Sequence, residues 1–377
     1  MPPPYAPAAP GTVARKPGAW TWTVAEISGI AISVHATFLL LLAWLAVAFW
    51  FEAGTPARVV SGVALVLLLF GCVLLHELGH ALTARRFGFV TREITLLPIG
   101  GIARLERIPE DPMQSLWITL AGPAVNITIT AVLFVALRLT GTWQPITDIS
   151  LTQGPFLERL MLVNISLVLF NMLPAFPMDG GRALRALLAT RLDARRATRI
   201  AARLGQGMAA LLALAGWLGN PLLILIALFV WTGAAHEAAL ADFRAALRGI
   251  PVSRVMRTAF RVLTPGEPLV AAVELMQQGG QHDFPVTLDG RLVGLLTRQA
   301  LLGGLRKGGP HSTIADAMER DLQTVDPREM VESALGQLDA RQSSAAPVVQ
   351  DGRLIGLLTV ESVAEFLSLQ AVLDHAA

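Results

Sequence analysis

The run His76-Glu77-Leu78-Gly79-His80 places two histidines and a glutamate at a spacing that can do chemistry. In a helix, residues four apart lie on one face, so both imidazoles can bind the same metal ion. The glutamate between them can then reach a water molecule bound to that ion. The spacing therefore predicts a zinc site with His76 and His80 as ligands and Glu77 as the general acid and base.

A catalytic zinc site needs a third protein ligand, and Asp179 is the residue that fits. It directly follows an apolar run, and a charged side chain inside a membrane costs about 2.5–3.5 kcal/mol, so a functional role is the default interpretation. Two neutral imidazoles and one carboxylate leave zinc with a net positive charge, which lowers the pKa of bound water toward about 7. Asn171, shortly before Asp179, has an amide that can donate to a developing oxyanion. We expect one zinc ion per chain.

The metal motif stands in an unusually apolar chain. Hydrophobic residues make up 53% of its 377 residues and charged residues 15%, against about 25% charged in a typical soluble protein. No charged residue occurs from Val59 to Leu75, directly before the motif. The sequence therefore predicts a helical, polytopic membrane protein in contact with the lipid bilayer. Six spans are expected, at 36–51, 59–84, 116–137, 160–173, 204–218 and 221–241.

Basic residues set the expected orientation of these spans. Arginines are concentrated in the loops on one side of the expected spans. The loops on the other side contain no lysine or arginine; they are Glu52–Ala57, Thr140–Gln153 and Gly219–Asn220. Because basic loops stay in the cytoplasm, we expect a multi-pass protein of the cell membrane with its N-terminus and its C-terminal region cytoplasmic. The basic loops hold Arg85, Arg86, Arg92, Arg104, Arg107, Arg182, Arg185, Arg191, Arg195, Arg196, Arg199 and Arg203.

Three segments before the fourth span are not expected to cross the membrane. Residues 1–18 are rich in proline and alanine, which predicts a disordered arm. Trp20–Val34 is expected to lie at the membrane interface, with its tryptophans near the headgroups. Gly88–Arg107 contains Leu97-Pro98-Ile99-Gly100-Gly101-Ile102, which predicts two short strands around a Gly-Gly turn. Such backbone near a membrane must line a cavity or pack on protein.

The C-terminal region contains an internal repeat. Asp289-Gly290-Arg291-Leu292-Val293-Gly294-Leu295-Leu296-Thr297 recurs 62 residues later as Asp351-Gly352-Arg353-Leu354-Ile355-Gly356-Leu357-Leu358-Thr359. Each unit has the pattern of a helix, a strand, an Asp-Gly turn, a strand and a helix. One such unit is too small to bury a core alone, so we expect two units to pack into one α/β domain.

Together these motifs resemble the site-2 protease family of intramembrane zinc metalloproteases, in the branch fused to a pair of CBS modules. The resemblance depends on His76-Glu77-x-x-His80 late in one span and on Asn171 and Asp179 after another. It covers about 30–242 and 252–369. It implies a helical polytopic membrane protein with a membrane-dipping β-hairpin, followed by an α/β CBS pair. The expected domains are a disordered arm at 1–18, a transmembrane metalloprotease at 19–243, and CBS modules at 252–304 and 313–370.

The resemblance also implies an activity, the cleavage of a transmembrane segment of a single-pass membrane protein in regulated intramembrane proteolysis. His76, His80 and Asp179 take the place of the family's zinc ligands, Glu77 that of its acid and base, and Asn171 that of its substrate or oxyanion contact. Pro98-Ile99-Gly100-Gly101 resembles the hairpin that offers its edge to an unwound substrate strand. Gly79, a small residue beside the ligands, is expected to let this hairpin or the substrate approach closely.

Some positions leave two interpretations open. Asn126, in a small-residue motif of the third span, bonds a neighbouring helix or binds substrate. His35, at the start of the first span, is interfacial or an accessory to the active site. Cys72, one turn before His76, packs within its helix or acts near the metal.

The CBS pair also keeps two interpretations. Such pairs often bind adenosine nucleotides, with an aspartate three residues after a serine or threonine holding the ribose. Thr297 and Thr359 can contact phosphate, but Ala300 and Ser362 stand where the aspartates would be. Nucleotide binding and a structural role, such as forming a homodimer through the CBS modules, both stay open.

Two other functional classes fit parts of the sequence. A CBS-regulated transporter or channel would distribute its polar residues along a pathway instead of converging them on one metal. A catalytically inactive relative would act as an adaptor, but it would have no need for Glu77. The net charge of +2 gives no support to a nucleic-acid partner.

Overall fold

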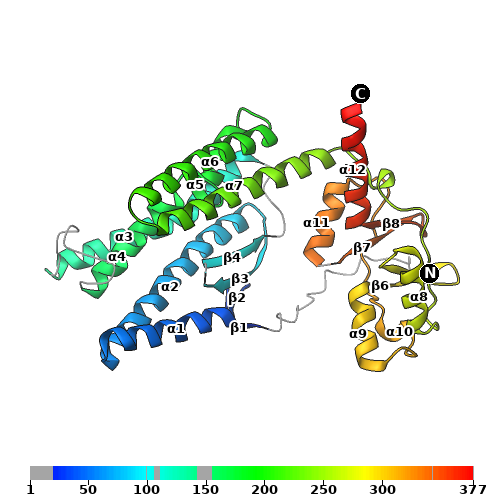
Figure 1. Ribbon diagram of the computed structural model, residues 1–377, viewed down its shortest axis with the longest axis horizontal. Helices are drawn as coiled ribbons and strands as arrows, with labels where there is room; N and C mark the ends of the chain where they lie inside the picture. The colour runs from blue at the N-terminus through cyan, green and yellow to red at the C-terminus, as the bar shows by residue number, and fades with distance from the viewer. Residues whose placement is uncertain (1–19, 99, 106–110, 142–154, 342, 377) are drawn as a thin grey trace, which may run out of the picture. The chain divides into compact units, whose positions relative to one another are not determined.

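The structure is a computed structural model that describes residues 20–98, 100–105, 111–141, 155–341 and 343–376. The chain forms two compact units, Met1–Ala238 and Ala239–Ala377 (Figure 1). The predicted arm at 1–18 and the hairpin residue Ile99 lie outside the described residues.

Helices dominate the first unit, and a helix lies at each of the six positions where a span is expected. Among the described residues, four helices are long and apolar enough to cross a membrane: α2, α3, α6 and α7. Helix α1 is a shorter apolar helix, and α4 has 16 residues. The bounds are α1 Ala36–Ala53, α2 Pro56–Arg86, α3 Pro112–Leu139, α4 Phe156–Asn171, α5 Asp179–Ala189, α6 Ala194–Leu218 and α7 Leu222–Leu247.

Helix α2 carries the His-Glu-x-x-His run and is the longest helix of this unit. It begins with Pro56 in its first turn, where the missing N–H of proline costs nothing. Its 31 residues span about 46 Å at 1.5 Å per residue, more than the roughly 30 Å of a hydrocarbon core. Arg85 and Arg86 fill its last turn, where positive charge favours the helix dipole. The metal motif therefore lies near the basic end of the helix.

A four-stranded sheet packs against α2 (Figure 1). The strand order is β1-β2-β3-β4; β2 and β3 are parallel, and the other neighbours are antiparallel. Ile30 of β2 and Ile94 of β3 are buried against Leu78 and Ala81 of α2. The sheet thus covers the helix beside the metal motif. The strands are β1 Thr21–Ile27, β2 Ile30–His35, β3 Thr91–Leu97 and β4 Gly100–Leu105.

The segment Trp20–Val34, expected at the membrane interface, contains two strands that the sequence did not predict. This segment forms the β1–β2 hairpin, whose turn residues Ser28 and Gly29 have φ of 52° and 77°. Positive φ at both positions is the geometry of a two-residue hairpin turn. Trp20 and Trp22 are exposed, and the alternation of buried Ile30 and Ile32 with partly exposed residues is that of a strand.

The β3–β4 hairpin occupies the segment where two strands are expected, but its turn is not at the glycines. Leu97 pairs with Gly100 and Leu96 with Gly101, so both glycines already belong to β4. The hairpin also forms one sheet with β1 and β2. Strand β4 is consequently an edge strand.

The second unit contains the two expected α/β repeats, each with its own core. In the first, Leu263, Phe284 and Leu296 are buried together, and in the second, Val325 and Leu358 belong to the core. The two Asp-Gly turns have positive φ at both residues, as predicted. The elements are a 3₁₀ turn at Val252–Arg254, α8 Leu269–Gly279, β5 Phe284–Leu288, β6 Arg291–Leu296, α9 Arg298–Gly308, α10 Ile314–Ala317, α11 Val331–Arg341, β7 Ala345–Gln350, β8 Arg353–Thr359 and α12 Val360–Ala376.

Candidate metal centre and active site

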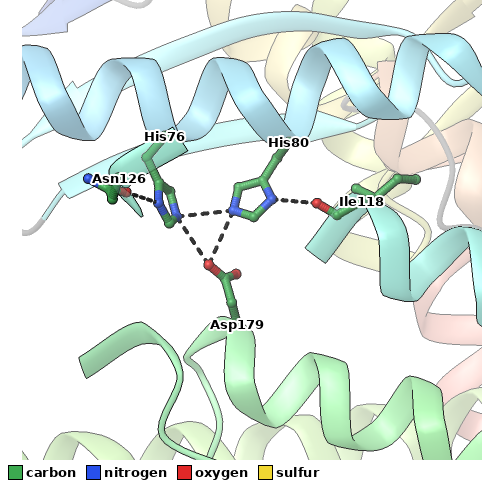
Figure 2. Close-up of polar contacts among 5 residues, drawn as sticks. All are labelled: His76, His80, Ile118, Asn126 and Asp179. Atoms are coloured by element: carbon green, nitrogen blue, oxygen red, sulfur yellow. Dashed lines mark hydrogen bonds and ion pairs between the residues drawn. The ribbon is translucent and has the colours of Figure 1, made fainter. Parts of the chain in front are cut away.

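Three acidic or imidazole side chains from two helices meet inside the first unit (Figure 2). His76 and His80 point from α2, and Asp179 is the first residue of α5. Asp179 Oδ2 lies 3.1 Å from Nε2 of His76 and 3.2 Å from Nε2 of His80, and the two Nε2 atoms are 3.1 Å apart. All three residues are at most 8% exposed. The structure therefore brings together the three residues that the sequence predicts as metal ligands.

Hydrogen bonds behind the imidazoles fix which nitrogen faces the centre. His76 Nδ1 lies 2.6 Å from Oδ1 of Asn126, and His80 Nδ1 lies 2.7 Å from the carbonyl oxygen of Ile118 (Figure 2). Both partners are oxygen atoms that only accept, so each Nδ1 carries the hydrogen and donates it. Each Nε2 of the neutral rings then presents a lone pair toward Asp179.

This arrangement fits a metal ion. Two Nε2 lone pairs and a carboxylate oxygen face one another, and a proton can bridge only two of them, whereas a cation satisfies all three. A tetrahedral zinc ion with bonds of about 2.0–2.2 Å holds its ligand atoms about 3.3–3.5 Å apart. The triangle of 3.1, 3.1 and 3.2 Å is close to that spacing.

Gly122 of α3 keeps space open beside the three ligand atoms. A Cβ on this residue would overlap Nε2 of His80 and lie 2.7 Å from Nε2 of His76. Any side chain here would therefore overlap the imidazole nitrogens that would hold an ion. The donor set and this cradle both fit zinc.

Glu77 meets the sheet through another glycine. A Cβ on Gly101 would lie 2.7 Å from Cγ of Glu77, so the backbone of edge strand β4 lies against the glutamate. Gly100 has a φ of 131°, and Pro98 is partly buried in the turn. Gly101 of the hairpin therefore lies next to the predicted acid and base.

The role predicted for Gly79 is wrong. A Cβ there would lie 2.8 Å from Cγ2 of Val125 and 2.9 Å from the carbonyl oxygen of Ala121, both on α3. Gly79 lets two helices approach, and Gly101 is the glycine that lets the hairpin approach. The sequence shows that residue 79 is small, but it does not show which element packs against it.

Asn126 is fully buried and bonds two other helices. Besides accepting from His76 on α2, it donates from Nδ2 to Oδ1 of Asn164 on α4 at 2.8 Å. Asn164 in turn lies 3.3 Å from Sγ of Cys72. The sequence analysis did not single out Asn164, although an asparagine inside an apolar span is a signal for a functional or packing role.

Two predicted residues are not joined to the cluster in the described part of the chain. Asn171 ends α4 and is partly buried, and no hydrogen bond links it to His76, His80 or Asp179. His35 caps α1, with its Nδ1 lying 2.8 Å from Oγ1 of Thr37.

In the CBS unit, the two predicted phosphate contacts cap helices. Thr297 accepts from the N–H of Ala300 and donates to Oε1 of Glu319 at 3.0 Å. Thr359 accepts from the N–H of Ser362 at 3.1 Å. Both threonines are buried, and the hydroxyl of Thr297 both accepts and donates within the protein.

A hollow in this unit lies beside the second threonine. Asp283 in its wall is 3% exposed, and burial raises the pKa of its carboxyl, although bonds from the Ser344 hydroxyl and the Arg298 N–H oppose this effect. Residues of both signs line the hollow, among them Arg257, His282, Asp283, Thr359 and Glu361.

Comparisons with known proteins agree with this division. The family model described as Peptidase family M50 matches residues 64–150 and 146–215, and the CBS domain model matches 252–307 and 314–369. Zinc metalloprotease MJ0392 of Methanocaldococcus jannaschii is 31% identical over 345 residues, which are 91% of this chain and 95% of that protein. Stage IV sporulation protein FB of Bacillus subtilis is 31% identical over 136 residues, which are 36% of this chain and 44% of that protein.

A solved structure, the site-2 protease from Methanocaldococcus jannaschii, is 38% identical and covers 58% of this chain and 95% of that one, with a TM-score of 0.43. The chain belongs to peptidase family M50. It is a multi-pass membrane protein, a zinc metalloprotease of the site-2 type with a C-terminal CBS pair. The family, the fold class and the enzyme class predicted from the sequence are thus confirmed.

Proposed function

We propose that this chain is a zinc-dependent intramembrane endopeptidase whose single zinc ion is held by His76, His80 and Asp179. The observation that carries the proposal is the convergence of two Nε2 lone pairs and a carboxylate oxygen beside Gly122. A transporter or channel gives no reason for three buried acceptor atoms to face one another within 3.2 Å.

The mechanism divides the work between the ion and Glu77. When bound, the ion supplies a water molecule of lowered pKa and polarises the scissile carbonyl. The Glu77 carboxylate accepts a proton from the attacking water and then donates it to the leaving amide nitrogen. Asn126 and the Ile118 carbonyl hold the two imidazoles so that Nε2, not Nδ1, faces the ion. Asn171 is the proposed donor to the oxyanion, which requires its amide to reach the substrate carbonyl in the complex.

Strand β4 is the proposed substrate-binding edge. A peptide bond inside a helix is sheltered by its own hydrogen bonds, so the substrate must unwind before it is cut. An unwound strand can pair with the free edge of β4, and Gly101 brings that edge against Glu77. Pro98, Ile99, Gly100 and Gly101 then form the substrate contacts.

The substrate class and the orientation are parts of the same proposal. The substrate is the transmembrane segment of a single-pass membrane protein, cleaved in regulated intramembrane proteolysis. The basic residues at the end of α2 and along α5 and α6 support a cytoplasmic N-terminus and a cytoplasmic CBS pair. The domains are then 19–243 for the protease and 252–304 and 313–370 for the CBS modules.

The CBS pair has a regulatory role in this proposal. Adenosine nucleotide binding and homodimerisation are its two candidate forms. The Thr297 hydroxyl accepts from the Ala300 N–H and donates to Glu319, so a nucleotide phosphate at this position would have to replace a bond that the protein already makes.

The decisive experiment compares wild type with Glu77→Gln in detergent or nanodiscs, using a model transmembrane substrate. Loss of the general acid and base should lower the cleavage rate by about 10²–10⁴-fold. The zinc content should stay at one ion per chain, because Glu77 is not a ligand. Glu52→Gln, on the exposed surface of α1, is the matched control and should cleave at the wild-type rate. Full cleavage by Glu77→Gln would refute the mechanism, and a wild type that binds no zinc would refute the metal site.

A further inference from the structure

Four polar side chains make a series of contacts across three helices, and one turn of α2 closes the series into a ring. The ring starts at Cys72 of α2, passes through Asn164 of α4 and Asn126 of α3, and returns to α2 at His76, one turn after it began. Its contacts are Cys72 Sγ to Asn164 Nδ2 at 3.3 Å, Asn164 Oδ1 to Asn126 Nδ2 at 2.8 Å, and Asn126 Oδ1 to His76 Nδ1 at 2.6 Å. Both asparagines are 0% exposed.

The direction of each bond in the ring follows from a single backbone carbonyl. Asn164 Nδ2 donates to the carbonyl oxygen of Leu160 at 2.9 Å, so Oδ1 of Asn164 must face Asn126. That oxygen only accepts, so Asn126 must turn its Nδ2 toward Asn164 and its Oδ1 toward His76. An oxygen facing Nδ1 of His76 requires the hydrogen on Nδ1, which leaves the Nε2 lone pair for the metal.

We propose that Asn164 is a positioning residue that acts through Asn126 to keep His76 in its metal-binding tautomer. The inference rests on the proposed zinc site and assigns the origin of its geometry to a residue on α4, two contacts away from the ligand His76. Without the Asn164 oxygen, the amide of Asn126 is free to rotate. Its Nδ2 then faces His76, and this donor selects the tautomer with the hydrogen on Nε2, which cannot bind zinc.

The test uses the difference between an amide and a carboxylate. Asn164→Leu removes the acceptor and should weaken zinc binding about 10–100-fold, the usual cost of losing an outer partner of a metal ligand. Adding Asn126→Asp should restore the affinity to within about threefold of wild type, because both carboxylate oxygens accept from His76 and no rotation presents a donor. If Asn164 only filled space, its loss would not be rescued by a carboxylate at the neighbouring position 126.

Zinc affinity of the full-length protein is measured by competition with a chromogenic chelator, with a thermal unfolding curve for each variant. Asn164→Asp keeps an acceptor for Asn126 and should bind zinc within about threefold of wild type; a tenfold loss would overturn the proposal. Ser166→Ala, on the same helix, removes a hydroxyl bonded only to its own helix at Leu162, and should change nothing.

The proposal fails if folded Asn164→Leu binds zinc like wild type, or if the added Asn126→Asp restores nothing. If Asn164→Leu does not fold, the same loss of zinc affinity is expected for Asn164→Ala. The zinc affinity of Asn164→Asp then still tests whether an acceptor at position 164 is what matters. A wild type without zinc would refute the proposed function itself, whereas a wild type with zinc and no effect at Asn164 would refute this inference alone.

Discussion

Polar groups are buried in both units of this protein, but they are arranged in opposite ways. At the metal centre, two Nε2 atoms and one carboxylate oxygen face one another. The Nδ1 atoms of the two histidines donate to Asn126 and to the carbonyl oxygen of Ile118. In the CBS unit, Thr297 bonds Glu319, Thr359 bonds the N–H of Ser362, and Asp283 accepts from Ser344 and Arg298.

The metal centre and the CBS unit differ in which partners their buried acceptor atoms need. Burying an unsatisfied polar group is costly, so acceptors that face one another require a cation, whereas acceptors that face donors require nothing. The protease centre is therefore incomplete without its ion. The Thr297 hydroxyl is satisfied in the protein alone, so a ligand there must compete with bonds that already exist.

The largest effect is expected from filling the cradle at the metal centre. Gly122→Val puts side-chain atoms where they overlap Nε2 of His80, so zinc affinity should fall by more than about 100-fold and cleavage should disappear with it. Gly71→Val is the control, because a Cβ on Gly71 of α2 meets nothing within 4 Å. Equal zinc content in the two variants, measured by atomic absorption, would contradict the position assigned to the ion.

Metal removal should destabilise the protease unit and leave the stability of the CBS unit unchanged. A ligand present at 100 times its dissociation constant stabilises a protein by about 2.7 kcal/mol, so chelation should loosen the helices that hold the ligands. Hydrogen exchange should rise in α2 and α5 and stay constant in β5–β8. Adding AMP or ATP should protect the CBS unit less than zinc protects α2. The reverse order would overturn the contrast drawn between the two regions.

Asp283 gives a smaller effect, visible in the pH dependence of stability. Burial raises the pKa of this carboxyl from 3.8, so the folded state holds its proton more tightly than the unfolded chain does. Its contribution to stability is complete below the unfolded pKa and is lost as the pH rises through the raised folded value. Asp283→Asn keeps the Oδ1 acceptor for Ser344 and Arg298 and cannot ionise.

The stability of Asp283→Asn relative to wild type should therefore be higher at pH 7 than at pH 4. Urea unfolding of the full chain at both pH values, followed in the CBS unit, provides the comparison. A gain that is the same at both pH values would show that ionisation of Asp283 is not its cause.

The smallest effect is expected at the helix caps of the CBS unit. Thr297→Val removes the bond to the Ala300 N–H and the bond to Glu319, which should cost about 0.5–2 kcal/mol in urea unfolding. Thr287→Val, in strand β5, should stay within about 0.5 kcal/mol of wild type. If Thr297→Val is equally neutral, the threonine hydroxyl is not held by the protein, and a ligand at this position becomes the better explanation.

Local rules explain which features the sequence predicted correctly. Two histidines four residues apart share a helix face whatever surrounds them, and an Asp-Gly pair between two strands predicts a tight turn by itself. The sequence did not predict the strands within Trp20–Val34 or the neighbour of Gly79, and both omissions have one cause. A strand needs partners and a small residue needs a neighbour, and both come from distant parts of the chain: β2 pairs with β3, and Gly79 meets α3.

The sequence by itself determined the enzyme class, the helix that carries the ligand pair and the repeat of the CBS pair, because each depends on contacts within a few turns or on similarity along the chain. Only the tertiary structure brought Asp179 to within 3.2 Å of both histidines and closed the ring from His76 through Asn126 to Asn164. Side chains on separate helices meet only where packing sets the rotation of each helix, and rotation is a property of the assembled bundle, not of any one segment.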